Sequence, residues 1–499
     1  MELQFNKTMI PCLKTLVREV QNQEQTQDVR LTDEMPDVGT VIASWGQIII
    51  RGKEWRGNSM NVSGGVMAWV LYDPDEGGAP KCVETWLPFQ MKWDFPDSER
   101  DGSIHIVPLL RSVDARVLSA RKIMVRSSVS ILGEAMLPGE VEVYEPGEIP
   151  EDICLQKQRF FFQIPIEAGE KAFALEESIP IPASTPQYDK IIRYQLRPEL
   201  TDHKIVADKV VFRGVAMLHV LYQGEDGQMY AMDFDIPFSQ YTELDREQEP
   251  DSIVNMNLIV TNLELERGEE SNLILKAGMS GQYIVFGRSF AEIVSDAYSP
   301  RRGVTPERIS LQLPSLLDYL DETMAVQQDV SADCNHGIDI DFCPEHPRVY
   351  HEGDSAVAEM AGMFGMLHYE ESGQLVQQNP RWNGNWTIPA ENGVRVEVYL
   401  QPVGKVQMTA GNGTVTLKAD MRVIALITEG QGIPMVTSLA VTEPEEPNPG
   451  RPSLIICRVG AEGLWGLAKR AGSTVEMIEK ANGLNEEPLE GTMLLVPVM

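Results

Sequence analysis

A short apolar stretch recurs along the chain. Gly64–Tyr72 reads GGVMAWVLY, and residues 214–222 read GVAMLHVLY at an offset of 150 residues. Each stretch is followed by an acidic, glycine-containing turn and then by a stretch containing Pro-Phe, at Pro88-Phe89 and Pro237-Phe238. An apolar strand, a turn and a second strand are typical of a β-hairpin. The sequence therefore predicts the same hairpin twice.

A third and more divergent copy lies further along the chain. Residues 362–369 read GMFGMLHY and are followed by the turn Glu370-Glu371-Ser372-Gly373. This copy lacks the Val-Leu-Tyr and Pro-Phe marks of the first two. We expect it to form the same hairpin.

Each copy also has later segments in which apolar and polar residues alternate. In Val394–Val398 the apolar residues fall on one face of a strand, which is the period of a half-buried strand. The pattern predicts a mainly β protein of tandem β-sandwich-like repeats. The predicted strands are 113–117, 123–125, 129–131, 254–260, 273–275, 283–285, 394–398, 415–417 and 421–423. The predicted organisation is an N-terminal segment 1–30, then repeats 31–150, 175–300 and 310–442, the last one divergent.

A proline-rich segment separates the third repeat from a short tail. Residues 443–452 contain four prolines and three glutamates, a composition that forms no core and favours an extended spacer. We expect this linker to hold the tail, residues 453–499, away from the repeats.

The tail reads as strand, helix, helix, strand over 453–459, 464–471, 474–481 and 494–497. The spacing predicts a small α/β domain of βααβ order, with Ser473 capping the second helix. The residues expected to face inward are Leu464, Leu467, Ala468 and Ala471 in the first helix, and Val475, Ile478 and Ala481 in the second. Trp465 is expected to be half-buried between helix and sheet.

Charge and cysteine usage narrow the function classes. The formal net charge is −32, which disfavours nucleic acid and anionic membrane surfaces and favours either simple solubility or a basic protein partner. Six scattered cysteines do not form a disulfide framework, so a reducing cytoplasm is expected. The N-terminus lacks a signal-peptide pattern, and no apolar window is long enough for a membrane span.

Catalytic motifs are not found. The chain has no phosphate-binding glycine loop, no Gly-x-Ser-x-Gly elbow and no His-Glu-x-x-His, so we expect no enzyme and no cofactor. Cys334, His336, Cys343, His346 and His351 contain zinc-ligand types, but Cys-x-His is too tight for the usual zinc knuckle. We therefore expect surface and strand residues there and no metal site.

Two carboxylates, Asp339 and Asp341, share one face of a predicted strand. They could act as a pair, but the other face carries Ile338, Ile340 and Phe342. That pattern favours a solvated face for the two aspartates.

The Gly-hydrophobic-Val-Leu-Tyr strand, the acidic turn and the Pro-Phe strand end resemble the SPOCS domain family of spore coat and exosporium proteins, over roughly residues 30–440. The tail resembles a LysM module through Leu464-Trp465, Leu467-Ala468-Lys469, Asn482 and Leu494–Pro497. Where LysM modules carry Gly-Asp-Thr or Gly-Asp-Ser, this chain has Ala461-Glu462-Gly463.

The pairing of these two families is similar to clostridial coat proteins whose LysM module docks on the ATPase of the coat's basement layer. The resemblance implies a non-enzymatic scaffold at the forespore surface, in the mother-cell cytoplasm, that binds a coat morphogenetic protein. The alternatives are a module that binds peptidoglycan or N-acetylglucosamine chains and a lattice subunit that self-associates through strand edges. The implied partner or glycan site is Ala461, Glu462, Gly463, Leu464, Asn482, Gly483, Leu484 and Asn485.

Overall fold

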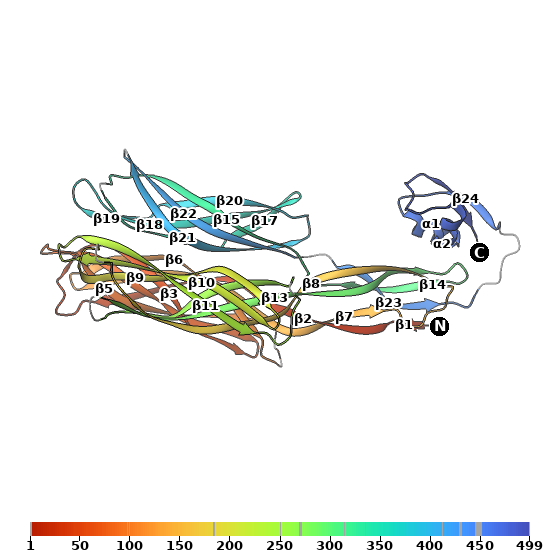
Figure 1. Ribbon diagram of the computed structural model, residues 1–499, viewed down its shortest axis with the longest axis horizontal. Coiled ribbons are helices and arrows are strands. Elements are labelled where there is room, and N and C mark those ends of the chain that lie inside the picture. Colours follow the sequence, from red (N-terminus) through yellow and green to blue (C-terminus); the bar gives the residue numbers. More distant parts are fainter. Residues whose placement is uncertain are drawn as a thin grey trace.

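The structure is a computed structural model of the 499-residue chain. It describes residues 2–96, 98, 100–182, 185–249, 251–268, 272–313, 315–334, 336–411, 413–428, 432–444 and 452–498. Figure 1 shows an elongated molecule with a broad head, a narrower stalk and a small C-terminal module beside the far end of the stalk. The N-terminus lies at that same end.

Repeat 1, residues 6–145, is a sandwich of two three-stranded antiparallel sheets with strand orders β3-β4-β5 and β2-β7-β6. Side chains from both sheets, such as Val66, Leu87 and Ile131, are fully buried between them. The alternation predicted a strand in both 123–125 and 129–131, and both belong to one strand, β7. The strands are β2 (Asn6–Arg30), β3 (Val38–Arg56), β4 (Ser59–Pro74), β5 (Lys81–Asp94), β6 (Ser103–Ser119) and β7 (Lys122–Glu145).

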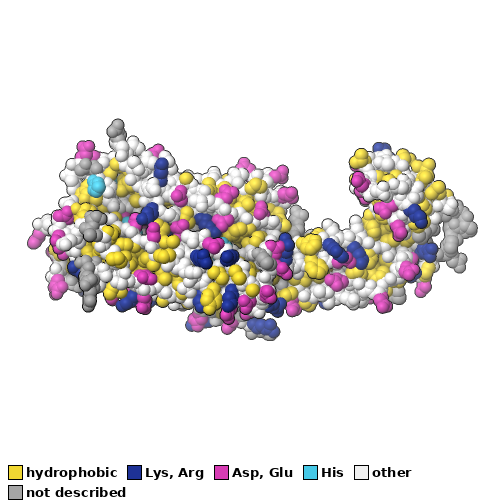
Figure 2. Space-filling view, in the orientation of Figure 1, with side chains coloured by type: hydrophobic (Ala, Val, Ile, Leu, Met, Phe, Trp, Pro, Cys, Tyr) yellow, Lys and Arg dark blue, Asp and Glu magenta, His cyan; other side chains and the backbone are white. Residues whose placement is uncertain are grey.

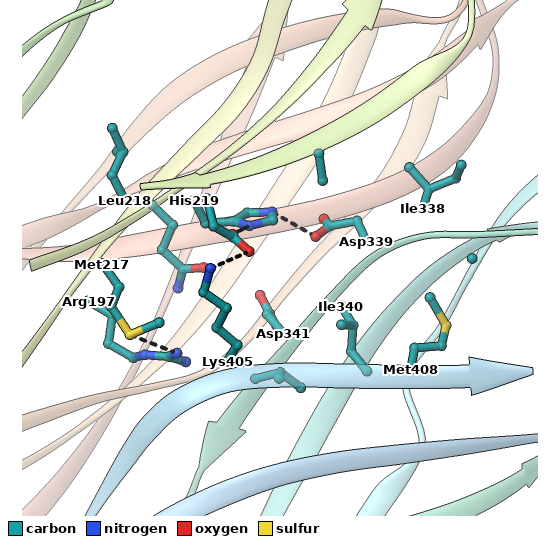
Figure 3. Close-up of a pocket in the computed structure, with 15 residues that line it drawn as sticks. Arg197, Met217, Leu218, His219, Ile338, Asp339, Ile340, Asp341, Lys405 and Met408 are labelled. Atoms are coloured by element: carbon teal, nitrogen blue, oxygen red, sulfur yellow. Dashed lines mark hydrogen bonds and ion pairs between the residues drawn. The ribbon is translucent and has the colours of Figure 1, made fainter. Parts of the chain in front are cut away.

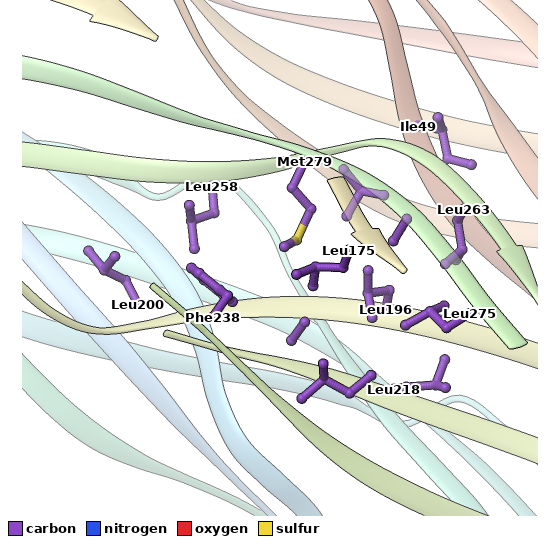
Figure 4. Packing of buried hydrophobic residues seen from close by; sticks show 14 of the residues in the cluster. Ile49, Leu175, Leu196, Leu200, Leu218, Phe238, Leu258, Leu263, Leu275 and Met279 are labelled. Carbon is purple, nitrogen blue, oxygen red and sulfur yellow. The ribbon is translucent and has the colours of Figure 1, made fainter. Parts of the chain in front are cut away.

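Repeat 2, residues 154–298, has the same plan, with sheets β9-β10-β11 and β8-β13-β12. Figure 4 shows its core, where Leu196 and Leu218 of one sheet meet Leu275 and Met279 of the other. Ile49 of repeat 1 is buried in the same core. The strands are β8 (Cys154–Ile179), β9 (Tyr188–Val206), β10 (Lys209–Gly224), β11 (Met229–Glu243), β12 (Ile253–Arg267) and β13 (Leu273–Tyr298).

Repeat 3, residues 304–441, keeps this order with interrupted strands. Sheet β15-β22-β21 packs against a sheet in which β18 pairs with β16 and β17 on one side and with β19 and β20 on the other. Pro344 and Pro347 lie where β16 gives way to β17, because proline has no N–H to donate to a strand partner. The strands are β15 (Leu316–Ser331), β16 (His336–Pro344), β17 (Arg348–Glu352), β18 (Ser355–Tyr369), β19 (Leu375–Gln378), β20 (Arg381–Pro389), β21 (Arg395–Gly411) and β22 (Thr414–Thr428).

The predicted hairpin is present in all three repeats. Gly77, Gly227 and Gly373 close the equivalent turns with φ of 79°, 81° and 82°, a backbone conformation that favours glycine. The N–H of each donates to the carbonyl three residues earlier. The divergent third copy is therefore a hairpin with the same turn as the first two.

The Pro-Phe mark has a packing reason. Phe89 lies directly across the strand pair from Gly64, and Phe238 from Gly214. A Cβ at Gly64 would lie 2.9 Å from Phe89 Cζ, and one at Gly214 would lie 2.4 Å from Phe238 Cζ. The glycine is needed because the ring of the opposite phenylalanine fills the space of a side chain.

The three repeats share buried clusters. Leu71, Leu221 and Leu367, each six residues before its turn glycine, belong to one cluster. A second cluster joins Leu132, Phe286 and Leu426, again one from each repeat. Repeats of one fold that bury equivalent residues against each other have the arrangement of a trimer, here within a single chain.

The stalk consists of the ends of the longest strands. β2 and β7 continue beyond their sandwich as ribbon 1 (residues 6–14 with 137–145), and β8 and β13 continue as ribbon 2 (residues 154–165 with 286–298). A third sheet has the order β1-β23-β14. Ile10, Phe162, Ile293, Leu311 and Met435 bring all three together in one buried cluster. The remaining strands are β1 (Glu2–Gln4), β14 (Val304–Leu311) and β23 (Ile433–Val441).

The stalk changes the expected domain boundaries. β2 occupies most of the segment 1–30 that the sequence set apart, and it pairs along its length with β7. β8 begins at Cys154, before the expected start of repeat 2 at residue 175. Strand pairing between residues 92 to 144 positions apart decides both boundaries, and local patterns do not report it.

The C-terminal module has the predicted βααβ order, with β24 (Leu454–Arg458), α1 (Gly463–Ala471), α2 (Val475–Asn482) and β25 (Met493–Pro497). The inward face predicted for α1 is buried, and so is Ile478 of α2. Two details were wrong. Thr474, whose side chain accepts from the Met477 N–H, caps α2 in place of buried Ser473, and Ala481 is exposed.

Candidate functional site

The first predicted loop, before α1, leaves few side chains free. Leu464 is only 1% exposed and belongs to the module core, as predicted for the apolar face of the first helix, so its side chain is not available to the implied partner site. Glu462 forms an ion pair with Arg470 of α1. Gly463 has a φ of 64°, and Ala461 is exposed. The exposed part of this loop is therefore Ala461 and the paired Glu462.

The second predicted loop, after α2, is tied to the sheet. The Asn482 amide donates to the Leu495 carbonyl at 2.6 Å and accepts from the Leu495 N–H at 2.8 Å. Gly483, with a φ of 62°, ends α2, and Leu484 packs against the module core. Asn485 is exposed. Asn482 thus holds β25 in place and is not free to bind a ligand.

Glu487 connects the two loops. Its carboxylate accepts from the Leu464 N–H at 2.7 Å, at the start of α1. This contact places the eight predicted residues on one end of the module. Of these, Ala461, Glu462, Gly483 and Asn485 are exposed.

Trp465 is partly buried against the module core and also contacts the stalk. Its ring lies edge-on to Tyr298 of ribbon 2, with centroids 4.8 Å apart, and its Nε1 donates to Asp296 Oδ2 at 2.9 Å. Lys469 Nζ also pairs with Asp296, at 2.7 Å. The expectation that the tail stands away from the repeats is therefore wrong. Most of the expected spacer, residues 445–451, lies outside the described residues.

The outer face of the module's sheet is apolar and exposed. Leu454 and Ile456 of β24 and Met493 and Leu495 of β25 all point away from the helices. Both helices cover the opposite face, where Leu494 and Val496 are buried. Sequence reasoning missed this surface, although the run Leu454-Ile455-Ile456 is apolar on both faces of a strand that only one layer can cover.

A different candidate site lies in the head, where a pocket of about 270 Å³ is lined by residues of repeats 2 and 3 (Figure 3). Repeat 2 contributes His219 and Asp233, and repeat 3 contributes Asp339, Asp341 and Lys405. Beside the pocket, Arg193 Nη2 lies 2.8 Å from Asp339 Oδ2, and both side chains are 1% exposed. We call Arg193, His219, Asp233, Asp339 and Asp341 the interface cluster.

Arg193, which lies in repeat 2, contacts both of the other repeats. Its Nη1 donates to Asp341 Oδ2 at 3.1 Å, and its guanidinium lies 4.9 Å from the ring centroid of Trp45 in repeat 1. The expectation of a solvated face for Asp339 and Asp341 is wrong, because repeat 2 covers that face and supplies their counter-ion. The one sequence signal for Arg193 was a charge inside an apolar strand.

Protonation states in the interface cluster follow from its geometry. His219 Nδ1 lies 2.7 Å from Asp233 Oδ1, and its Nε2 lies 2.8 Å from Asp339 Oδ1. Burial opposes the charge on His219, but Asp339 and Asp233 outweigh it and raise its pKa to about 9. Burial also raises the pKa of Asp339, but Arg193 and His219 outweigh it and lower that pKa to about 2. At neutral pH both groups are charged, which fits an ion-pair lock between repeats better than proton transfer.

The other two boundaries between repeats have their own charged contacts. Arg18 of repeat 1 lies 3.2 Å from Glu397 of repeat 3, and Lys53 of repeat 1 lies 2.7 Å from Glu170 of repeat 2. Lys53 also donates to the buried Gln282 at 2.7 Å. Because the three contacts differ in residue type, each repeat has a distinct place in the head.

The cysteines and histidines weighed for zinc do not converge. Cys343 Sγ lies 4.0 Å from Asp341 Oδ1, while burial lowers the pKa of His346 to about 4 and His351 is exposed on β17. Within the part of the chain that the structure describes, no group of three or more His, Cys, Asp or Glu side chains is placed to hold a metal ion. In the same part, neither helix has the length and apolar character needed to cross a membrane.

Comparison with known families identifies one segment. Residues 187–267 match the family described as SipL, SPOCS domain. The match runs from β9 to the end of β12. It therefore covers the whole sheet β9-β10-β11 of repeat 2 and one strand, β12, of the other sheet. It supports the resemblance to the SPOCS domain that the repeat pattern suggested. No curated protein and no solved structure matches the chain.

Proposed function

We propose that this chain is a non-enzymatic scaffold of spore coat or exosporium assembly. The match of residues 187–267 to the SipL SPOCS domain carries the proposal, because it associates repeat 2 with sporulation. Repeats 1 and 3 have the same fold as repeat 2, so we assign the same association with sporulation to the whole head. The charged groups of the interface cluster are paired with each other, which suits a rigid assembly unit.

We further propose that the LysM-like module docks on a coat morphogenetic protein, the basement-layer ATPase, at the forespore surface in the mother cell. An exposed apolar face at Leu454, Ile456, Met493 and Leu495 supports protein binding, since apolar surface on a small module costs free energy unless a partner covers it. The stalk supports this role too, because the module lies at its far end from the head (Figure 1).

Localisation of fluorescent fusions during sporulation tests the proposal. Deleting residues 453–499 should leave the repeats folded and abolish recruitment to the forespore surface. The single change Ile456→Asp should also abolish recruitment, because it places a charge in the centre of the apolar face. Leu489→Asp changes another exposed apolar residue, outside the two strands, and should recruit normally. Normal recruitment of the truncated chain would assign recruitment to the repeats instead.

Binding of N-acetylglucosamine chains is the competing function. It is disfavoured because Glu462 is paired with Arg470 and because the Asn482 amide is bonded to Leu495. Titration calorimetry of the full chain with chitin oligomers should show weak or no binding. An affinity near 1 μM, about −8 kcal/mol, would instead support the cell-wall function.

A further inference from the structure

The outer face of ribbon 2 carries two exposed phenylalanines. Phe161 is 77% exposed and Phe290 is 71% exposed, and they lie directly opposite each other on β8 and β13. Aromatic side chains bury more apolar area than most others, so two adjacent ones in water mark a surface that another molecule covers. Figure 2 shows apolar side chains at the stalk surface between the head and the module.

Cations surround this aromatic pair. Lys157 and Arg159 lie on β8, and Arg288 lies on β13, all three at least partly exposed. Within the ribbon the facing acid is Glu292, which pairs with Lys157 at 2.9 Å and with Arg159 at 3.7 Å, and Asp251 from a neighbouring loop pairs with Arg288. Three cations against two carboxylates leave this face with one excess positive charge, on a chain whose net charge is −32.

Ribbon 1 presents the complementary face. Counting back 150 residues, Phe161 corresponds to Pro11 and Phe290 to Glu140, and these two are also directly opposite each other. The next pair on the same face is Met9 and Glu142, with Glu142 bound to Lys7 at 2.9 Å. Met9, Pro11, Glu140 and Glu142 are all exposed. The face thus combines apolar side chains with carboxylates where ribbon 2 has rings and cations.

We propose that ribbon 2 of one copy of this chain packs face to face on ribbon 1 of a second copy. The two rings of ribbon 2 would cover Met9 and Pro11, and its cations would lie near Glu140 and Glu142. Two ribbon 2 faces would instead bring the cations of both copies together, which disfavours a symmetric pair. Because the donor and acceptor faces differ and belong to different ribbons, a single contact leaves one donor face and one acceptor face free, so association continues from copy to copy unless both contacts form within one pair.

The contact is small, since each face is two strands wide. Interfaces below the standard size are weak or transient, so association should be reversible and grow with concentration. Sedimentation velocity of the full chain measures this association. At 0.15 M salt the Debye length is about 8 Å, so the repulsion between two acidic molecules is largely screened. This inference goes beyond the proposed function and does not depend on what the module binds.

Three sets of variants test the contact. Phe161→Thr with Phe290→Thr should weaken association about tenfold or more while keeping strand-forming residues. Val206→Thr with Tyr241→Thr is the matched control, because both are exposed apolar residues on the head, and it should associate like the wild type. Circular dichroism checks that each variant is folded.

Charge exchange gives the sharpest test. Glu140→Arg with Glu142→Arg should be monomeric, and so should Arg159→Glu with Arg288→Glu. An equimolar mixture of these two double variants should associate again, because each then offers a face complementary to the other. A wild-type chain that stays monomeric at high concentration would overturn the proposal and leave the aromatic face to a different protein. Association that needs the phenylalanines but ignores Glu140 and Glu142 would also overturn it, in favour of symmetric pairing.

Discussion

Replacing Arg193 with methionine should destabilise the head more than any exposed arginine substitution. Arg193 and Asp339 are each 1% exposed and lie 2.8 Å apart, and Asp341 is the second carboxylate on the same guanidinium. Methionine keeps an unbranched apolar side chain but removes the guanidinium and its charge. The change leaves Asp339 buried with His219 as its remaining cationic partner.

The expected cost follows from that arrangement. Removing one partner of a buried ion pair costs about 3–5 kcal/mol, and the retained His219 places this case near the lower end. About 3 kcal/mol corresponds to a factor of roughly 100 in the unfolding equilibrium. With a urea dependence of about 1–3 kcal/mol per molar, the first unfolding transition should move down by about 1–3 M.

Urea titration followed by circular dichroism measures this shift, with the first transition used because a chain of several domains need not unfold in one step. Arg56→Met is the matched control, since Arg56 is 66% exposed and pairs with Glu54, and its midpoint should barely move. Combining Arg193→Met with Asp339→Leu should cost less than the sum of the single changes. An Arg193→Met midpoint no lower than that of Arg56→Met would refute the ion-pair lock.

Three further predictions concern pH, docking and the hairpin. The pKa of His219 is raised from 6.5 to about 9 in the folded state, so its contribution to the free energy of unfolding is complete below pH 6.5 and is lost as pH rises through 9. Between pH 6 and 10, urea titrations should therefore show the wild type losing about 3 kcal/mol more of its free energy of unfolding than His219→Gln. Trp465→Ala and Asp296→Asn should release the module from the stalk, which small-angle scattering would detect as a larger radius of gyration; an unchanged radius would contradict the docked position. Gly64→Ala should lower the melting temperature, because a Cβ there would lie 2.3 Å from the Ile49 carbonyl oxygen; an unchanged melting temperature would show that the strand pair can shift without cost.

Much of the local structure could be predicted from the sequence. Alternation of apolar and polar residues identified the later strands of each repeat, and the acidic glycine turn identified the hairpins, including the divergent one at Gly373. Helical spacing identified the buried face of α1. These features depend on residues close together in the chain, where periodicity and turn chemistry act directly.

The candidate site was predicted less well. The loop residues around Glu462 and Asn482 lie at one end of the module, but Leu464 is in the core and Asn482 is bonded to β25. A residue that begins an apolar helix face has the same sequence signal whether it is buried or forms an exposed contact. Only packing distinguished the two.

The sequence by itself determined the β-rich repeats, the turn glycines and the βααβ module, because each follows from the local order of apolar, polar and flexible residues. Only the tertiary structure decided that the first strands continue into a stalk, that Asp339 is buried against Arg193 and that Trp465 rests on Tyr298. Each of these contacts joins residues more than 100 positions apart. Their partners are selected when three similar repeats pack around shared clusters, and periodicity within one strand shows which face is apolar but not which surface will cover it.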